Sequence, residues 1–291
     1  MAIASPGIIK ATNDALVEVR PAINVVKQFA YDMSDEFATP GDTVKVPVAS
    51  TGALTAFNAS SNNFETEDGS ISWETVKLDS TVKSTFKVSA QNMLDMPMAS
   101  YWETIAKASA NAVNKFISDK IGGLFVKATF KDTEVVKTGD LTKAAVAKLR
   151  TNCKGRVDET VLLLKPDWFA DVLGELDSST FGGTDPIRNG RVDNLYGFAS
   201  VVEARGLPTG VNGVLLPKDC LVVASRAFAV ADESVYSEYG TAKDAETGFT
   251  LTAMRHGAPA TGGAFLNVAA LFGLKLIQTS KIVTIVAAAT T

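Results

Sequence analysis

The sequence is poor in the side chains that most enzymes use for chemistry. Among 291 residues it has one histidine, His256, and two cysteines, Cys153 and Cys220. A single histidine excludes any site that needs two and weakens any Ser-His or Cys-His triad. Two cysteines in a chain of this length indicate reduced thiols, not a disulfide framework. His256 lies in an Arg-His-Gly-Ala-Pro stretch, and we expect it to be a turn residue.

Catalytic motifs are also missing. The chain has no Gly-x-x-x-x-Gly-Lys phosphate loop, no Gly-x-Ser-x-Gly elbow, no His-Glu-x-x-His and no Cys-x-x-Cys. Asp185, Asn189 and Asp193 lie in a glycine-rich loop, but they lack the ligand order and the closing glutamate of a calcium loop. We therefore predict no enzyme activity, no cofactor and no metal site. A soluble enzyme that uses carboxylates around the Asp185 loop stays as a rival.

Neither charge nor hydropathy is strongly biased. Lys and Arg number 28 against 32 Asp and Glu, a net charge of -4, which gives no general attraction to nucleic acid or to an anionic membrane. The first residues contain no basic region followed by an apolar core, so no secretory signal is expected and the protein should be made and kept in a cytoplasm. Residues 257–274 are too polar and too broken by glycine and proline for a membrane helix.

A long hairpin is the strongest positive feature. Apolar residues between 76 and 90 keep one parity, which predicts one strand of unusual length. Residues 44–48 alternate in the same way, and the stretch 49–70 between these arms is polar and rich in small residues. A lone two-stranded ribbon is marginal in water, so this hairpin needs a second chain to rest on. The sequence points first to assembly.

A long amphipathic helix is predicted at residues 100–122. Ser100 and Glu103 have the spacing of a capping box, and glycines at 122 and 123 supply the stop. Apolar side chains recur at steps of three and four. Trp102 and Phe116 fall on this apolar stripe, so we expect them in the core and not in a stacking platform for bases.

The second half of the chain predicts a compact mixed domain. We expect a short helix at 141–150, a buried strand at 160–164 and a helix that Pro166 opens. Short strands are expected near 199–202, 214–216, 220–224 and 249–253. The last apolar block, 264–285, should return to the core of this mixed domain.

Charged side chains of the hairpin are candidates for a subunit interface. Glu65, Glu67 and Asp68 cluster near the tip, and Lys77, Lys83 and Lys87 line the polar parity of the descending strand. Two interpretations stay open. Both groups can be solvated faces that keep a ribbon soluble, or the acidic tip can dock on basic residues of a neighbouring subunit.

The order of these elements resembles the major capsid protein of tailed bacteriophages, the Hong Kong 97-like fold. The run Leu-Leu-Leu-Lys-Pro-Asp-Trp at 162–168 is similar to the family's strand, proline and helix entry to its axial domain. Pro186-Ile187, the stretch 195–198 and Leu207-Pro208 are similar to a further run of the family. The resemblance covers essentially the whole chain.

The resemblance implies an α+β fold with an N-terminal arm, an extended E-loop hairpin, a peripheral domain with a long spine helix and an axial mixed α/β domain. The implied boundaries are an arm at 1–40, a peripheral domain at 41–137 with the E-loop at 49–83 and the spine helix at 100–122, an axial domain at 138–232, peripheral strands at 233–256, and a return to the axial domain at 257–291.

The implied function is that of a shell protein in a virion, assembled in the cytoplasm of a host bacterium. Copies would form hexamers and pentamers of an icosahedral head around double-stranded DNA, which they would contact without specificity. A separate scaffolding protein, a portal and a decoration protein are the expected partners, with no membrane. An encapsulin-like nanocompartment is the nearest rival. A tail or decoration protein fits less well.

Overall fold

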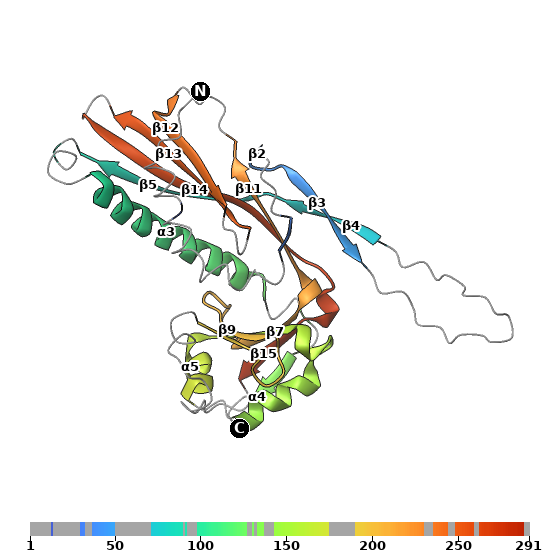
Figure 1. The fold of residues 1–291 in the computed structure, drawn as a ribbon. Coiled ribbons are helices and arrows are strands. Elements are labelled where there is room, and N and C mark those ends of the chain that lie inside the picture. Colours follow the sequence, from blue (N-terminus) through green and yellow to red (C-terminus); the bar gives the residue numbers. More distant parts are fainter. Residues whose placement is uncertain are drawn as a thin grey trace.

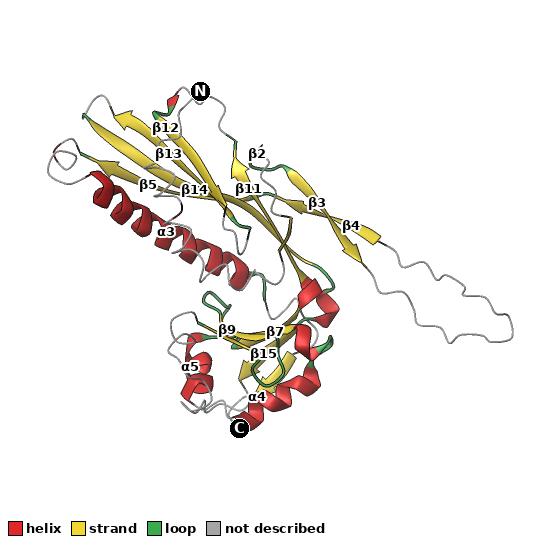
Figure 2. Ribbon diagram, viewed as in Figure 1, coloured by secondary structure: helices red, strands yellow, loops and turns green. Residues whose placement is uncertain are grey.

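The computed structural model describes the greater part of the chain: residues 13, 30–32, 37–49, 71–89, 91, 98–126, 130, 133–136, 143–174, 190–229, 235–243, 248–258 and 262–287. Three sheets and three helices of seven or more residues organise these segments (Figure 1). Figure 2 shows a long helix beside the larger sheet and shorter helical segments around the smaller sheet.

The larger sheet is built around one long strand, β14. Its neighbours follow the order β1-β11-β14-β13-β12, while β5 pairs with the other side of β14 and β2 pairs with β11. The strands are β1 (Ala30–Asp32), β2 (Phe37–Ala38), β5 (Ser80–Val88), β11 (Leu221–Phe228), β12 (Glu238–Lys243), β13 (Thr250–Ala258) and β14 (Gly263–Leu276).

Helix α3 (Met98–Gly123) covers one face of this sheet. Its residues Val113, Ile117 and Ile121 are buried at four-residue spacing and share a core with the β14 residues Val268 and Phe272. The predicted helix at 100–122 corresponds to α3. The helix begins two residues before the predicted cap, so the capping-box serine lies inside its first turn.

The smaller sheet has the order β6-β15-β10-β7-β9-β8. Two helices, α4 (Lys143–Leu149) and α5 (Pro166–Gly174), pack against it. Its strands are β6 (Thr133–Val136), β7 (Thr160–Leu164), β8 (Arg191–Asp193), β9 (Ser200–Glu203), β10 (Gly213–Pro217) and β15 (Val283–Ala287). Short 3-10 turns lie at Arg150–Asn152, Val157–Glu159, Lys218–Cys220 and Thr279–Lys281.

Strand β7 joins the two halves of the molecule because it is buried on both faces. Val161 and Leu163 contribute to the core shared with α3, whereas Leu162 and Leu164 contribute to the core under α4 and α5. A continuous apolar run is what a strand between two layers requires. The predicted strand at 160–164 and the predicted helix at Pro166 are confirmed.

The ribbon consists of β3 (Thr43–Ala49) and β4 (Ile71–Lys77), paired antiparallel from Thr43 with Lys77 to Ala49 with Ile71. The predicted single long strand is wrong, because residues 78 and 79 separate β4 from β5. The two strands pair with different partners: β4 with β3 and β5 with β14. The parity of the apolar residues continues across the break, so periodicity alone does not reveal it.

The expected path of the last apolar block also needs correction. We expected 264–285 to return to the mixed domain, but β14 is the centre of the larger sheet and only β15 joins the smaller one. Strand β11, expected within an axial domain at 138–232, likewise pairs with β14. An apolar strand can pack in either core, so the hydrophobic pattern of one segment does not predict which sheet it joins.

His256 is a strand residue and not the expected turn residue. It lies in β13, opposite Phe265 of β14, and the two rings are stacked with centroids 5.0 Å apart. Tyr236 approaches the imidazole edge to face, at 6.0 Å. Among the described helices, none has the length and apolar character needed to cross a membrane.

Candidate assembly surface

One face of the ribbon is fixed to the body of the protein. Val44, Val46, Val76 and Leu78 are buried and form a cluster with residues of β11 and β14. The cluster uses side chains of β11 and β14 that lie on the sheet face opposite α3, including Val222, Ala224 and Leu271. Burial of about four aliphatic side chains is worth several kcal/mol, because each contributes about 1.5 to 3 kcal/mol. The base of the ribbon is therefore held firmly.

The other face of the ribbon is open and carries a large apolar residue. Trp73 is 63% exposed. Trp73 pairs directly with Pro47, which is also exposed, and Lys45 pairs with Thr75 in the next row of the same face. Exposed tryptophan on a rigid strand is typical of interface hot spots.

Strand β14 fastens the base of the ribbon by two contacts. Lys275 Nζ donates to Glu74 Oε2 at 2.8 Å and to the carbonyl oxygen of Thr75 at 3.1 Å. Two residues earlier, Gly273 lies so close to the carbonyl of Lys77 that a Cβ would collide with it. These contacts join β4 to β14 at the point where the ribbon leaves the sheet.

A turn before β3 completes this base. The carboxylate of Asp42 accepts hydrogen bonds from the backbone N–H of Thr39 at 2.7 Å and from its hydroxyl at 2.9 Å. These bonds, the backbone bond first, lower the pKa of Asp42. The backbone of Leu78 bonds Gly41 and Asp42, and this pairing extends the ribbon to its first turn.

The edge of the larger sheet at β5 carries the second exposed surface. Within the described residues β5 pairs with β14 and with no other strand. Lys83 and Lys87 are exposed on the face away from α3, opposite Ala269 and Phe265. Phe86, on the α3 face, is 40% exposed.

The six residues predicted for a subunit interface are placed as follows. Lys77 is exposed at the base of the ribbon, and Lys83 and Lys87 lie on β5. The structure brings no acidic side chain to these three lysines among the residues that it describes. The remaining three, Glu65, Glu67 and Asp68, lie outside the described residues.

Sequence reasoning missed the two exposed aromatic side chains, Trp73 and Phe86. Trp73 had a signal, since it shares the parity of Ile71 and Thr75, which is opposite to that of the buried Val76. Phe86 had none, because it shares its parity with buried residues and is exposed only by its position at a sheet edge.

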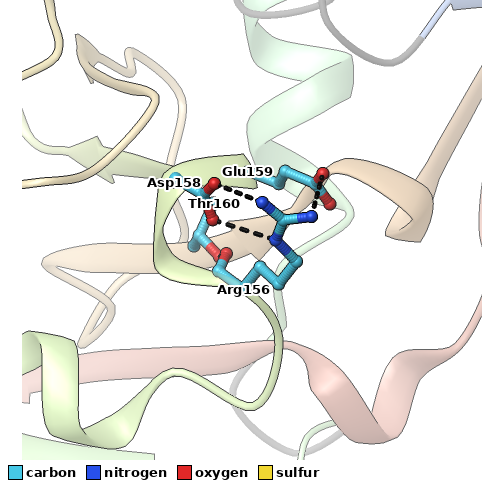
Figure 3. Close-up of polar contacts among 4 residues, drawn as sticks. All are labelled: Arg156, Asp158, Glu159 and Thr160. Atoms are coloured by element: carbon cyan, nitrogen blue, oxygen red, sulfur yellow. Dashed lines mark hydrogen bonds and ion pairs between the residues drawn. The ribbon is translucent and has the colours of Figure 1, made fainter.

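In a further charged cluster, before β7, the charged side chains pair with one another. Arg156 forms two hydrogen bonds with the carboxylate of Asp158, at 2.6 and 3.2 Å, and a longer ion pair with Glu159 at 3.4 Å (Figure 3). The bonds from Arg156 lower the pKa of Asp158. Thr160 donates to the carbonyl of Arg156 at 2.7 Å. This cluster stabilises the turn that enters β7 and leaves no unpaired charge for a ligand.

The candidate cation loop is not assembled into a site by the part of the chain described. Asp193 forms an ion pair with Arg191 at 2.6 Å, while Asp185 and Asn189 lie outside the described residues. Neither cysteine is in a disulfide, and burial raises the pKa of the Cys153 thiol. Phe116 packs against the main core, edge to face with Phe272 at 6.3 Å, as expected.

This arrangement of sheets, long helix and ribbon is the fold of phage capsid proteins. The capsid of the cyanophage P-SCSP1u aligns with 89% of this chain and 88% of its own, with a TM-score of 0.51 and 11% identity. The capsid of a native GTA particle covers 92% and 90%, with a TM-score of 0.52 and 12% identity. A virus-like particle from Pyrococcus furiosus covers 94% and 98%, with a TM-score of 0.50 and 12% identity.

No protein-family model matches the chain, and no curated protein matches it by sequence. At 11% to 12% identity the structural comparisons establish the fold alone.

Proposed function

We propose that this chain is a major capsid protein, a subunit that assembles with copies of itself into the closed shell of a phage head. The observation that carries the proposal is a ribbon fixed to the sheet on one face and exposing Trp73 on the other, in a fold similar to phage capsids. A ribbon on a firm base that exposes a tryptophan beside a proline suits contact with another subunit. Symmetry repeats each such contact many times over a shell.

The finer organisation is part of the proposal. The larger sheet with α3 corresponds to a peripheral domain, α3 to its spine helix, and the smaller sheet to an axial domain near the centre of hexamers and pentamers. β11 and β14, which pair with each other, belong to the peripheral part in this assignment. The ribbon would be the base of an E-loop, and the shell would enclose double-stranded DNA.

The docking of the acidic tip on the two lysines of β5, Lys83 and Lys87, is intermolecular in this proposal. Lys83 follows Ile71 by 12 positions, about 40 Å at roughly 3.3 Å per residue, and β4 and β5 run end to end in Figure 1. Glu65 precedes Ile71 by six positions and reaches at most about 20 Å from it. Side chains do not span the difference, so Glu65 would meet the Lys83 of another copy.

Electron microscopy of the purified protein, alone and with a co-expressed scaffolding protein, tests the proposal. Closed shells of uniform size support it, and a protein that stays monomeric under both conditions contradicts it. The contents of the particles separate a phage head, which packages DNA, from a cellular compartment, which holds protein cargo.

A further inference from the structure

The edge of β5 that faces away from β14 has no described strand beside it along the nine residues of β5. On one side β5 pairs with β14 from Ser80 to Val88, and on the other it pairs with no described strand. Such an edge is a template for a strand from another chain. The register of β5 with β14 defines what each face of an added strand would meet.

The two faces of this edge differ in chemistry. The face away from α3 presents Thr81, Lys83, Thr85 and Lys87, all exposed. The α3 face presents the partly exposed ring of Phe86 beyond the half-buried Val82 and Ser84. A strand that fits needs acidic residues at one parity and an apolar residue at the other.

Residues 63–68 of this chain have that pattern. Glu65 and Glu67 share one parity, while Phe64 and Thr66 share the other. In an antiparallel register that places Glu67 opposite Lys83, Glu65 lies opposite Thr85 and diagonal to Lys87, and Phe64 lies opposite Phe86. Asp68 falls on the α3 face, away from the two lysines.

We propose that residues 63–68 of a second copy add as a strand to the free edge of β5. The inference rests on the proposed function, since it gives the mode in which the hairpin of one subunit holds the next. Main-chain hydrogen bonds supply attachment, and the charged face and the Phe64–Phe86 side select the register. The occupant is a second copy because a chain's own tip does not reach this edge.

Charge reversal tests the pairing. Lys83→Glu with Lys87→Glu should lower particle yield about tenfold or more, since like charges then face each other across the pair. Glu65→Lys with Glu67→Lys should do the same, and the four changes together should restore yield to within about twofold. Reversal of two exposed lysines on helices, Lys115→Glu with Lys148→Glu, is the matched control and should leave yield unchanged.

Asp68→Lys distinguishes strand addition from general charge attraction. Its position on the opposite parity predicts yield within about twofold of the unmodified chain. A loss as large as that from Glu65→Lys with Glu67→Lys would overturn the strand model, as would failure of the fourfold variant to recover.

Amide hydrogen exchange measures directly whether the β5 amides gain hydrogen-bond partners on assembly. Peptides that cover 80–88 should exchange more slowly in particles than in unassembled subunits, because half of the β5 amides gain partners. Particles that form while β5 exchanges equally fast in both states would overturn this inference and leave the proposed function intact. A chain that forms no particles at all would instead remove the proposed function.

Discussion

Trp73 shows how one residue separates folding from assembly. The residue is 63% exposed, so Trp73→Ala should change the free energy of unfolding of the isolated subunit by less than about 0.5 kcal/mol. The same change should reduce assembly by about tenfold or more if the ring is buried against a neighbour. Thermal unfolding and sedimentation velocity measure the two effects.

Val235→Ala is a matched control for Trp73→Ala, because Val235 is also a large apolar residue, 62% exposed. It should alter neither quantity. Normal assembly of the Trp73→Ala variant would show that the open face of the ribbon is not a contact.

Asp42 links the base of the ribbon to pH. The hydrogen bonds from Thr39 lower its pKa in the folded protein, so the carboxylate stabilises the turn fully above its ordinary pKa. That stabilisation is lost as the pH falls through the folded value. We expect Asp42→Asn to be less stable than the unmodified protein at pH 7 and the difference to shrink below about pH 4. Urea unfolding at pH 7 and pH 3 measures it, and a constant difference would contradict the assignment.

Gly273 marks the closest approach between β14 and the ribbon. A methyl group at this position would collide with the carbonyl of Lys77, so Gly273→Ala should destabilise the protein by about 1 to 3 kcal/mol. Gly257→Ala is the control, because its Cβ would meet open space in the neighbouring strand β13. Urea unfolding should show little change for Gly257→Ala, and equal effects of the two substitutions would refute the close contact.

At the scale of elements, the ion pair of Lys275 with Glu74 joins two strands that are about 200 positions apart in the sequence. The pair is partly exposed and should contribute only about 0 to 1 kcal/mol to stability. Its larger effect should be on the direction of the ribbon. We expect Lys275→Met to broaden the size distribution of particles while thermal unfolding changes little.

The exchanged variant, Lys275→Glu with Glu74→Lys, tests whether the ion pair itself, and not the lysine alone, affects the direction of the ribbon. It preserves an ion pair between β14 and β4 and should narrow the distribution again, as electron microscopy would show. A Lys275→Met variant with particles of normal size would mean that the buried residues of the ribbon fix its direction unaided.

The sequence predicted those elements whose pattern is local. The run at β7 and the periodicity of α3 are complete within each segment. The break at Leu78 and Asp79 was not predictable, because it arises where two adjacent strands pair with different partners. The sheet that β14 joins was hidden for the same reason, since pairing is a property of two segments and periodicity of one.

The candidate surface was predictable in part. Lys83 and Lys87 stood out by alternation and lie on an exposed edge. The exposure of Phe86 depends on β5 having only β14 as a described neighbour, a fact of topology that no pattern in residues 80–88 contains. The prediction of a turn at His256 was wrong for a related reason. The glycine and proline that follow it suggested a turn, but the pairing of β13 with β14 continues there.

At the scale of the whole molecule, the chain combines two closed hydrophobic cores with apolar surface that it does not bury by itself. The core around α3 and the core under α4 and α5 are closed by the chain itself. The ribbon and the β5 edge expose Trp73 and Phe86, groups that isolated subunits leave in contact with water. A shell removes such surfaces from water in every subunit at once.

Cryo-electron microscopy of particles made from this chain would show whether the ribbon is a contact between subunits. We expect closed shells in which each ribbon lies against a neighbouring subunit and Trp73 is buried between them. Failure to form shells with a scaffolding protein present, or shells in which the ribbons contact no other copy, would contradict it.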